Sequence, residues 1–440
     1  MHNTLNILFF TYCRIAADLP KDTLKDIVIK GDAGKVQHLL KSSLEVENNR
    51  TIEKDLLLHE AIKNDHVKIL EILLKYSKSQ GQLLFVEDGD GRTILHLAVF
   101  LKREACCQAI MDCEPKIILR INKAGETPLH LMVNTKYLNG CKKALKCLPD
   151  SEDINVMNNK QHHTVVHLAA KGNLPEMLEL FLENGGNPCV KSRQNYTPLH
   201  YAAESGSTSC IDLLLNKINE EDKIAYINNK SSNGTTALML AAKHGFSDSV
   251  KHLEGANINL ADNDGYTALH FAAKKGSQSV VESLCDKGAN IDLETKGHQT
   301  AVVFAVTSNE FCLEYLLNKY TNIKKAQSET LLKIAVNKNQ SGCLRVLLAR
   351  PEIKEHINFQ IPNDKNTLLH LSLKKSYYKI TRELLKNGAE RDLLNDRQEL
   401  PLHLAAAQKS LRSSSSEEER MEECRNILRQ SHNFVNAQNQ

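Results

Sequence analysis

Neither a long apolar run nor a large excess of one charge is found in this sequence. A membrane-spanning helix needs ~18–20 consecutive apolar residues; no such run occurs, so we predict no membrane insertion within these 440 residues. Lys and Arg number 56 and Asp and Glu 53, a formal charge of +3. That balance predicts no general attraction to nucleic acid or to anionic membranes. The 41% apolar content, with 10 Pro and 20 Gly, excludes collagen-like, mucin-like and wholly disordered chains.

Sequence motifs for catalysis are also missing. The chain has no G-x-x-x-x-G-K-[ST], no G-x-G-x-x-G after a strand, no G-x-S-x-G and no H-E-x-x-H. We therefore predict no enzyme activity and no cofactor or metal. Asp88 and Asp90 begin like a calcium-binding loop, but the third acidic position and the closing Glu are missing, so a hairpin tip is predicted there. The 12 cysteines include no C-x-x-C pair, which indicates a reducing, cytoplasmic location.

The sequence does contain a repeated tetrapeptide. Nine copies begin with Thr: TILH at 93–96, TPLH at 127–130, TVVH at 164–167, TPLH at 197–200, TALM at 236–239, TALH at 267–270, TAVV at 300–303, TLLK at 330–333 and TLLH at 367–370. Weaker copies, LLLH at 56–59 and LPLH at 400–403, bracket the series. The ten steps from His59 to His403 average about 34 residues.

Other positions of the repeat predict two helices. The Thr hydroxyl is suited to cap a first helix, and Ala stands two residues after the fourth position in nine of the eleven copies, where a small side chain allows close helix packing. Six residues after the fourth position, a residue that tolerates left-handed geometry predicts the helix end: Gly206, Gly245, Gly276, Asn173, Asn309 or Asn339. Apolar residues at helical spacing, as in IDLLL at 211–215, then predict a second helix.

This period and signature resemble the ankyrin repeat, in which each copy forms a β-turn and two helices. The resemblance covers residues 22–440 and implies an all-α repeat solenoid of about eleven ankyrin repeats with β-hairpin or turn tips, plus an N-terminal half-repeat cap. In such repeats the fourth-position histidine bonds locally to backbone. We therefore assign His167, beside His162 and His163, a structural role rather than metal binding.

The predicted organisation has three parts. Residues 1–21 form a frayed N-terminal segment, 22–50 a degenerate capping half-repeat and 51–440 the array, which is best formed over 164–290. Extra residues at 216–234 lengthen one turn, whereas the short step before Thr330 predicts a tight or broken one. A polar insertion loop occupies 409–420 in the last copy. Residues 433–440 read as the opening of a further repeat, so we expect the chain to be a fragment of a longer protein.

Partner-binding candidates lie at the predicted tips. Arg92, Tyr196 and Tyr266 directly precede the Thr of their copies, and His298 lies two residues before Thr300. The signs of the tip charges are mixed, so we expect a protein partner held by tips and concave face, and no nucleic acid. The two tyrosines are suited to be binding hot spots. The alternative is that these residues are only solvated tips.

Two further groups of residues suggest chemistry. Cysteines recur before the apolar end of the second helix, at 107, 141, 210, 312, 343 and 424, which favours core packing. The alternative is that Cys141 and Cys343, which have basic neighbours in the sequence, are reactive thiols. Ser413, Ser414, Ser415 and Ser416 precede three acidic residues, and this pattern suits phosphorylation by acidophilic kinases.

Three functional hypotheses follow. The first is a non-catalytic interaction scaffold, part of a larger protein. The second is the cytosolic sensor or regulatory region of a cation channel, because the array resembles the N-terminal ankyrin region of A-subfamily transient receptor potential channels; the segment TPLHYAA at 197–203, the insertion before Gly234 and the segment GANID at 288–292 carry that resemblance. Its pore would lie outside this chain. The third is a targeting module of an enzyme whose catalytic domain lies elsewhere.

Overall fold

The computed structural model describes residues 24–42, 51–79, 87–148, 154–158, 160–319 and 325–407. The chain divides into two compact units, residues 1–219 (unit 1) and 220–440 (unit 2). In these residues all regular structure is helical, and one isolated antiparallel bridge joins Glu87 to Thr93. The predicted all-α repeat array is therefore confirmed, and the tips are turns rather than paired strands. No described helix has the length and apolarity to span a membrane.

Unit 1 contains twelve described α-helices and one 3-10 helix. They are α2 (Leu24–Lys30), α3 (Ala33–Ser42), α4 (Thr51–Lys63), α5 (Val67–Ser79), α6 (Ile94–Phe100), α7 (Glu104–Cys113), η2 (Pro115–Leu119), α8 (Pro128–Asn134), α9 (Leu138–Cys147), α10 (Val165–Lys171), α11 (Pro175–Glu183), α12 (Pro198–Ser205) and α13 (Thr208–Asn216). The helices α2 and α3 lie where the sequence predicts the degenerate capping pair.

Unit 2 contains thirteen described α-helices. They are α14 (Glu220–Ile227), α15 (Ala237–His244), α16 (Ser247–His252), α17 (Ala268–Lys275), α18 (Gln278–Asp286), α19 (Ala301–Ser308), α20 (Glu310–Lys319), α21 (Lys325–Asn337), α22 (Ser341–Leu348), α23 (Pro351–Lys354), α24 (Leu368–Lys374), α25 (Tyr378–Lys386) and α26 (Pro401–Ala407). The predicted long turn at 216–234 contains α14. The eleventh copy is described through its first helix α26, so the number of complete repeats stays a prediction.

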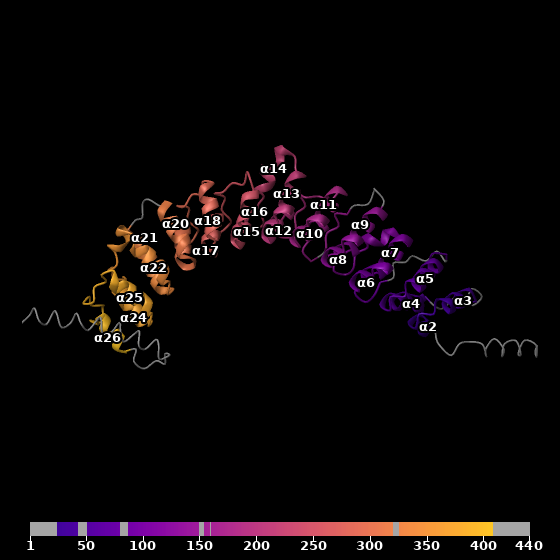
Figure 1. Cartoon of the computed structure of the whole chain (residues 1–440), viewed down its shortest axis with the longest axis horizontal. Coiled ribbons are helices and arrows are strands. Elements are labelled where there is room, and N and C mark those ends of the chain that lie inside the picture. Colours follow the sequence, from indigo (N-terminus) through magenta and orange to yellow (C-terminus); the bar gives the residue numbers. More distant parts are fainter. Residues whose placement is uncertain are drawn as a thin grey trace, which may run out of the picture. The chain divides into compact units, whose positions relative to one another are not determined.

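Each unit has two layers of helices, and Figure 1 shows the helix pairs following one another in chain order. The first helices of the copies pack side by side: α2, α4, α6, α8, α10 and α12 in unit 1, and α15, α17, α19, α21, α24 and α26 in unit 2. The second helices form the other layer: α3, α5, α7, α9, α11 and α13, then α16, α18, α20, α22 and α25. Each copy thus buries the apolar flank of its neighbour, as expected for a repeat array.

The positions of the first helices confirm the predicted register. Thr is the N-cap of eight of them, at 93, 127, 164, 197, 236, 267, 300 and 367. All nine predicted Ala positions are fully buried. Ser372 stands in place of Ala, and its buried hydroxyl has an acceptor because it donates to the Leu369 carbonyl at 3.0 Å. Met132 is buried at the remaining position.

Two positional predictions are wrong. Thr330 is not an N-cap: it lies inside α21, and its hydroxyl donates to the Ala326 carbonyl at 2.7 Å. Asn309 is not left-handed, since its φ is −151°. Its side chain instead accepts from the Phe311 N–H at 2.8 Å and donates to the Gly276 carbonyl at 3.0 Å. The other predicted helix ends do have positive φ, as at Gly245 and Asn339.

Candidate functional site

The tips are held in place by a threonine–histidine pair at the start of six first helices, α6, α8, α10, α12, α17 and α24. In α17, the Thr267 N–H donates to His270 Nδ1 at 3.1 Å, and the Thr267 hydroxyl lies 2.9 Å from the same atom. His270 Nε2 lies 3.1 Å from the carbonyl oxygen of Gln299 in the next tip. Because Nδ1 accepts and a carbonyl only accepts, the ring is the neutral tautomer with its proton on Nε2. The histidine thus joins its own helix start to the following tip.

The same arrangement recurs in both units. The Nε2-to-carbonyl distances are 2.9 Å for His96 to Glu126, 3.1 Å for His130 to His163, 3.1 Å for His167 to Tyr196 and 2.9 Å for His370 to Glu399. Burial lowers the pKa of His96 and His167 to about 4, although the bond to the carbonyl acts in the opposite direction. Burial also lowers the pKa of His130, His270 and His370. These contacts fit the structural role that the sequence predicts for the repeat histidine.

Backbone hydrogen bonds also connect neighbouring tips. In unit 1 the Lys123 N–H donates to the Asp90 carbonyl at 3.1 Å and the Arg193 N–H to the Gln161 carbonyl at 2.9 Å. Unit 2 has the corresponding bonds from Asn263 to Asn233, from Lys296 to Asp264 and from Asp396 to Asp364, at 2.9–3.1 Å. The side chains at these tips are therefore presented on a fixed backbone, which lowers the entropic cost of binding a partner.

The structure places the two tip candidates of unit 1 differently. Arg92 is partly exposed, forms an ion pair with Asp90 at 3.3 Å and lies over the ring of Phe100, which is 60% exposed. Tyr196 is half-buried and stacks on His200 with a centroid separation of 5.0 Å. Arg92 is thus open to a partner, whereas Tyr196 uses much of its ring area for packing within the copy.

Tyr266 belongs to an aromatic surface in unit 2. Its ring stacks on Phe271 at 5.3 Å and lies 5.5 Å from Phe304, so the tip tyrosine meets side chains of α17 and α19. The ammonium of Lys274 lies over Tyr266 at 5.6 Å and over Phe304 at 5.9 Å. Tyr266 and Phe271 are half-exposed, and Phe304 is 9% exposed. We call Tyr266, Phe271, Phe304 and Lys274 the aromatic surface.

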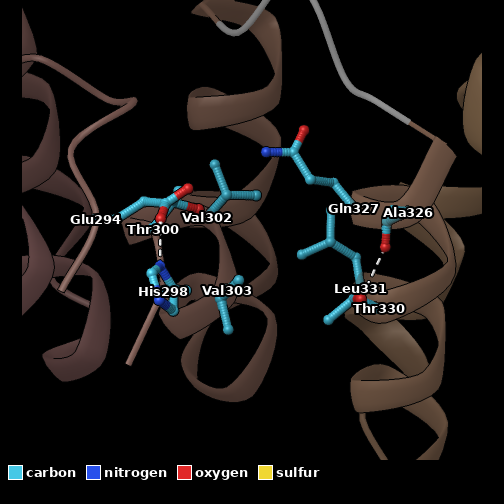
Figure 2. Close-up of a pocket in the computed structure, with 9 residues that line it drawn as sticks. All are labelled: Glu294, His298, Thr300, Val302, Val303, Ala326, Gln327, Thr330 and Leu331. Carbon is cyan, nitrogen blue, oxygen red and sulfur yellow. Dashed lines mark hydrogen bonds and ion pairs between the residues drawn. The ribbon is translucent and has the colours of Figure 1, made fainter. Parts of the chain in front are cut away.

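His298 lies at the edge of a groove between a tip and α21. Its side chain is 88% exposed, and Nδ1 lies 3.0 Å from Glu294 Oε2. Figure 2 shows Glu294 and His298 on one side and Gln327 and Leu331 of α21 on the other. The remaining lining residues are Thr300, Val302, Val303, Ala326 and Thr330. The groove therefore combines an apolar floor with an imidazole and a carboxylate at its rim.

The position of α21 accounts for this groove. Only five residues separate α20 from α21, whereas fourteen separate α18 from α19, so the predicted shortening before Thr330 agrees with the structure.

The copy in front of α21 has Val303 at the histidine position. A neutral histidine ring there would bury an Nε2–H group that needs a tip carbonyl, and a buried donor without an acceptor costs ~1–3 kcal/mol. Valine has no such requirement.

A histidine–tyrosine network in unit 1 was not foreseen from the sequence. His163 precedes Thr164 at a tip, yet it is only 4% exposed. Its Nε2 lies 2.7 Å from the hydroxyl of Tyr201, which in turn donates to Ser192 Oγ at 3.5 Å. Burial lowers the pKa of His163 to about 4. In the sequence, the only signal for this network is Tyr201, a large residue directly after the fourth position of its copy. That position does not reveal that the partner of Tyr201 is His163.

The cysteines of the second helices share one environment, as predicted. Cys107, Cys141, Cys210, Cys312 and Cys343 are all buried, and Cys424 lies outside the described residues. Burial raises the pKa of the Cys141 thiol to about 12 and that of Cys343 to about 11. Both properties disfavour the thiolate, so these positions fit the packing role better than the reactive-thiol alternative.

We expect thiol labelling of the folded chain to reflect this burial. Cys189 is the exposed one of the ten cysteines in the described ranges, so iodoacetamide should modify it before Cys141 and Cys343, which should react only after unfolding in urea. Peptide mass spectrometry of samples quenched at increasing times would measure the order. Modification of Cys141 or Cys343 as fast as Cys189 in the native chain would favour the reactive-thiol hypothesis instead.

The predicted hairpin tip at Asp88 and the predicted phosphorylation segment have different outcomes. Asp88 forms a tip turn, in which Oδ1 accepts from the N–H groups of Asp90 and Arg92 at 2.9 Å. The kinase-site candidates Ser413–Ser416, the insertion loop and the terminal residues 433–440 lie outside the described residues, as does the segment 1–21. No group of three or more His, Cys, Asp or Glu side chains suited to hold a metal occurs within the described ranges.

Comparison with known proteins matches this chain to a family model described as ankyrin repeats (3 copies), at residues 24–121, 129–225 and 221–295. The "B-cell lymphoma 3 protein homolog" of Mus musculus is 29% identical over 187 residues, which are 42% of this chain and 41% of that protein. The "Probable 26S proteasome regulatory subunit p28" of Saccharomyces cerevisiae is 30% identical over 215 residues, 47% of this chain and 88% of that protein. The "Transient receptor potential cation channel subfamily A member 1" of Homo sapiens is 27% identical over 236 residues, 52% of this chain and 20% of that protein. The matched region thus spans less than half the length of the first and the third of these proteins.

Proposed function

Because the chain belongs to the ankyrin-repeat family, we propose that it is a non-catalytic protein-interaction array. It holds a protein partner through the tips and the neighbouring exposed side of the first helices, as a scaffold in a reducing, cytosolic compartment. One relative is named as a probable regulatory subunit of the 26S proteasome, which is an assembly with other proteins. This supports an interaction role for this chain.

The observation that carries the proposal is the aromatic surface of unit 2. Tyr266 and Phe271 present partly exposed rings on a rigid frame, and the Lys274 ammonium lies beside them. Rigid aromatic side chains are enriched among the residues that dominate the energy of protein interfaces. They also lose little side-chain entropy on binding. Arg92 and His298 are the further contact candidates, because both reach solvent next to a tip turn.

Affinity capture with matched variants tests this proposal. Tyr266→Ala and Phe271→Ala should each lower recovery of the specific partner by about tenfold, the loss of ~1.4 kcal/mol expected for a hot-spot ring. Phe311→Ala is the control, because Phe311 is 56% exposed but lies on the second helix α20. Quantitative mass spectrometry of the captured proteins provides the measurement. Equal recovery with all three variants would contradict the use of this surface.

A channel-associated array is the second candidate. The match to the transient receptor potential channel extends over 236 residues, and the features at 197–203 and 288–292 carried that resemblance in the sequence. At 27% identity it is no closer than the matches to proteins of other names. Sequencing the complete transcript separates the two candidates: six apolar segments of membrane-spanning length favour the channel, and their absence leaves the scaffold.

A further inference from the structure

Unit 2 carries a row of exposed basic side chains at the ends of its first helices. The row consists of Lys243 and His244 on α15, Lys274 and Lys275 on α17, Lys338 after α21, and Lys374 and Lys375 at the end of α24. We call these seven residues the basic row. All of them are exposed, and each stands four or five residues after the fourth position of its tetrapeptide. The repeat register therefore places them at equivalent sites of successive copies.

Hydrogen bonds and close approaches join successive helix ends of the row. A Cβ at Gly245, directly after His244, would lie 3.7 Å from Lys275 Cγ. The hydroxyl of Ser308 at the end of α19 donates to the Ala273 carbonyl, and Gln340 Nε2 donates to the Thr307 carbonyl at 3.0 Å. Lys375 Nζ donates to the Asn337 carbonyl at 3.3 Å, beside Lys338. The charges thus form two clusters that the uncharged end of α19 connects.

Five lysines of the row are not neutralised by ion pairs within the described part of the chain. Among the described residues, no carboxylate forms an ion pair with Lys243, Lys274, Lys275, Lys338 or Lys375. Lysine in a last helical turn does stabilise the helix dipole. However, α8 in unit 1 ends at Asn134 and α12 ends at Ser205 after Glu204, so first helices of this chain fold without it. The repeated lysines of unit 2 therefore call for a second explanation.

The aromatic surface lies within the row. Lys274 belongs to both, since its ammonium lies over the rings of Tyr266 and Phe304. A ligand that follows the row therefore meets positive charge and half-exposed rings together. Acidic residues interspersed with aliphatic ones match that combination, because carboxylates pair with the lysines while aliphatic side chains cover the rings.

We propose that the basic row and the aromatic surface of unit 2 bind an acidic peptide segment with interspersed aliphatic residues, belonging to the protein partner. This inference rests on the proposed interaction function and adds the chemistry of the partner. A peptide is favoured over nucleic acid because the positive charges stand in two clusters separated by the uncharged end of α19, with half-exposed rings in one of them. A continuous phosphate backbone meets no unbroken run of positive charge there, and the net charge of +3 gives it little general attraction.

Fluorescence anisotropy with the full chain tests the proposal. The probe is a fluorescein-labelled peptide of alternating Glu-Leu and Asp-Leu pairs, measured at about 100 mM NaCl, where surface charges more than ~10 Å apart are largely screened. K274E/K275E and K374E/K375E should each weaken binding about fivefold or more, since two attractions become repulsions. The control K379E/K386E changes charge equally on the second helix α25, where both lysines are exposed, and should stay within about twofold of wild type.

Three outcomes overturn the inference. The first is an equal loss with K379E/K386E, which means that only net charge matters. The second is equal binding of a peptide with Gln and Asn in place of Glu and Asp. The third is tighter binding of a single-stranded DNA of the same charge. If the acidic peptide fails but capture of a partner still depends on Tyr266, this inference fails and the interaction function stands. If neither peptide binding nor partner capture depends on residues of unit 2, the proposed function fails as well.

Discussion

Lowering the pH from 7.5 to 4.5 should destabilise the array by several kcal/mol through its buried histidines. His96, His163 and His167 have a folded-state pKa of about 4, against an ordinary value of 6.5. In the unfolded chain these rings take up protons near pH 6.5, while in the folded chain they stay neutral. Each buried ring such as His96 or His167 then contributes up to about 3 kcal/mol, at ~1.4 kcal/mol per pKa unit.

The sign follows from which state binds more protons. Above pH 7 neither state is protonated at these rings, so their stabilisation is fully present. Between pH 6.5 and about 4 only the unfolded state takes up protons, and the free energy of unfolding falls with falling pH. The pKa values of Asp88 and Asp112 are lowered below 3.8, so these carboxylates act below that window. The loss between pH 6.5 and 4 thus reports on the histidines.

Urea unfolding at a series of pH values measures this effect. The slope of the unfolding free energy against pH near pH 5 should correspond to three or more protons taken up on unfolding. His167→Gln removes one buried ring and should reduce that slope by about one proton. Phe311→Ala is the control, because it removes a 56% exposed ring that carries no titratable group, and should leave the slope unchanged. A slope near zero would show that the rings are not held neutral.

The register of the first helices was predictable because its causes are local. A threonine N-cap, the histidine three residues later and a small residue two positions beyond all act within one turn or two. The threonine–histidine pair recurs in six copies with nearly identical hydrogen bonds, as at Thr127 and Thr367. Thr330 is the exception, and it shows that the signature residue alone does not determine where a helix begins. Thr330 keeps the signature residue but not the preceding tip, and helix α21 extends through it from Lys325.

The candidate site was predictable only in part, because its properties depend on neighbouring copies. Tyr266 was chosen for its place at a tip, but its surface forms with Phe304 from the next copy, about a repeat away in sequence. Likewise, the burial of His163 depends on Tyr201. Periodicity identifies equivalent positions, but it does not state how large side chains from two copies meet. The basic row was open to prediction, since Lys274 and Lys374 occupy one position of the repeat.

Phe181→Ala should produce the largest loss from a single substitution, about 3–5 kcal/mol. Phe181 lies on α11 and is 0% exposed, among the largest fully buried side chains. Helix α11 packs against α9, α10 and α13. Truncation therefore removes the ring from the contact between three copies and leaves a cavity that the surrounding helices can only partly fill.

Guanidinium unfolding of the full chain, followed by circular dichroism, gives the measurement for this variant. In repeat proteins, each copy gains its stability from its neighbours, so loss of the ring in α11 should weaken the folding of the adjacent copies of unit 1. Phe311→Ala removes the same ring from a site that is 56% exposed and should cost less than about 1 kcal/mol. If the two variants unfolded at the same denaturant concentration, Phe181 would not occupy the core that the helix register assigns to it.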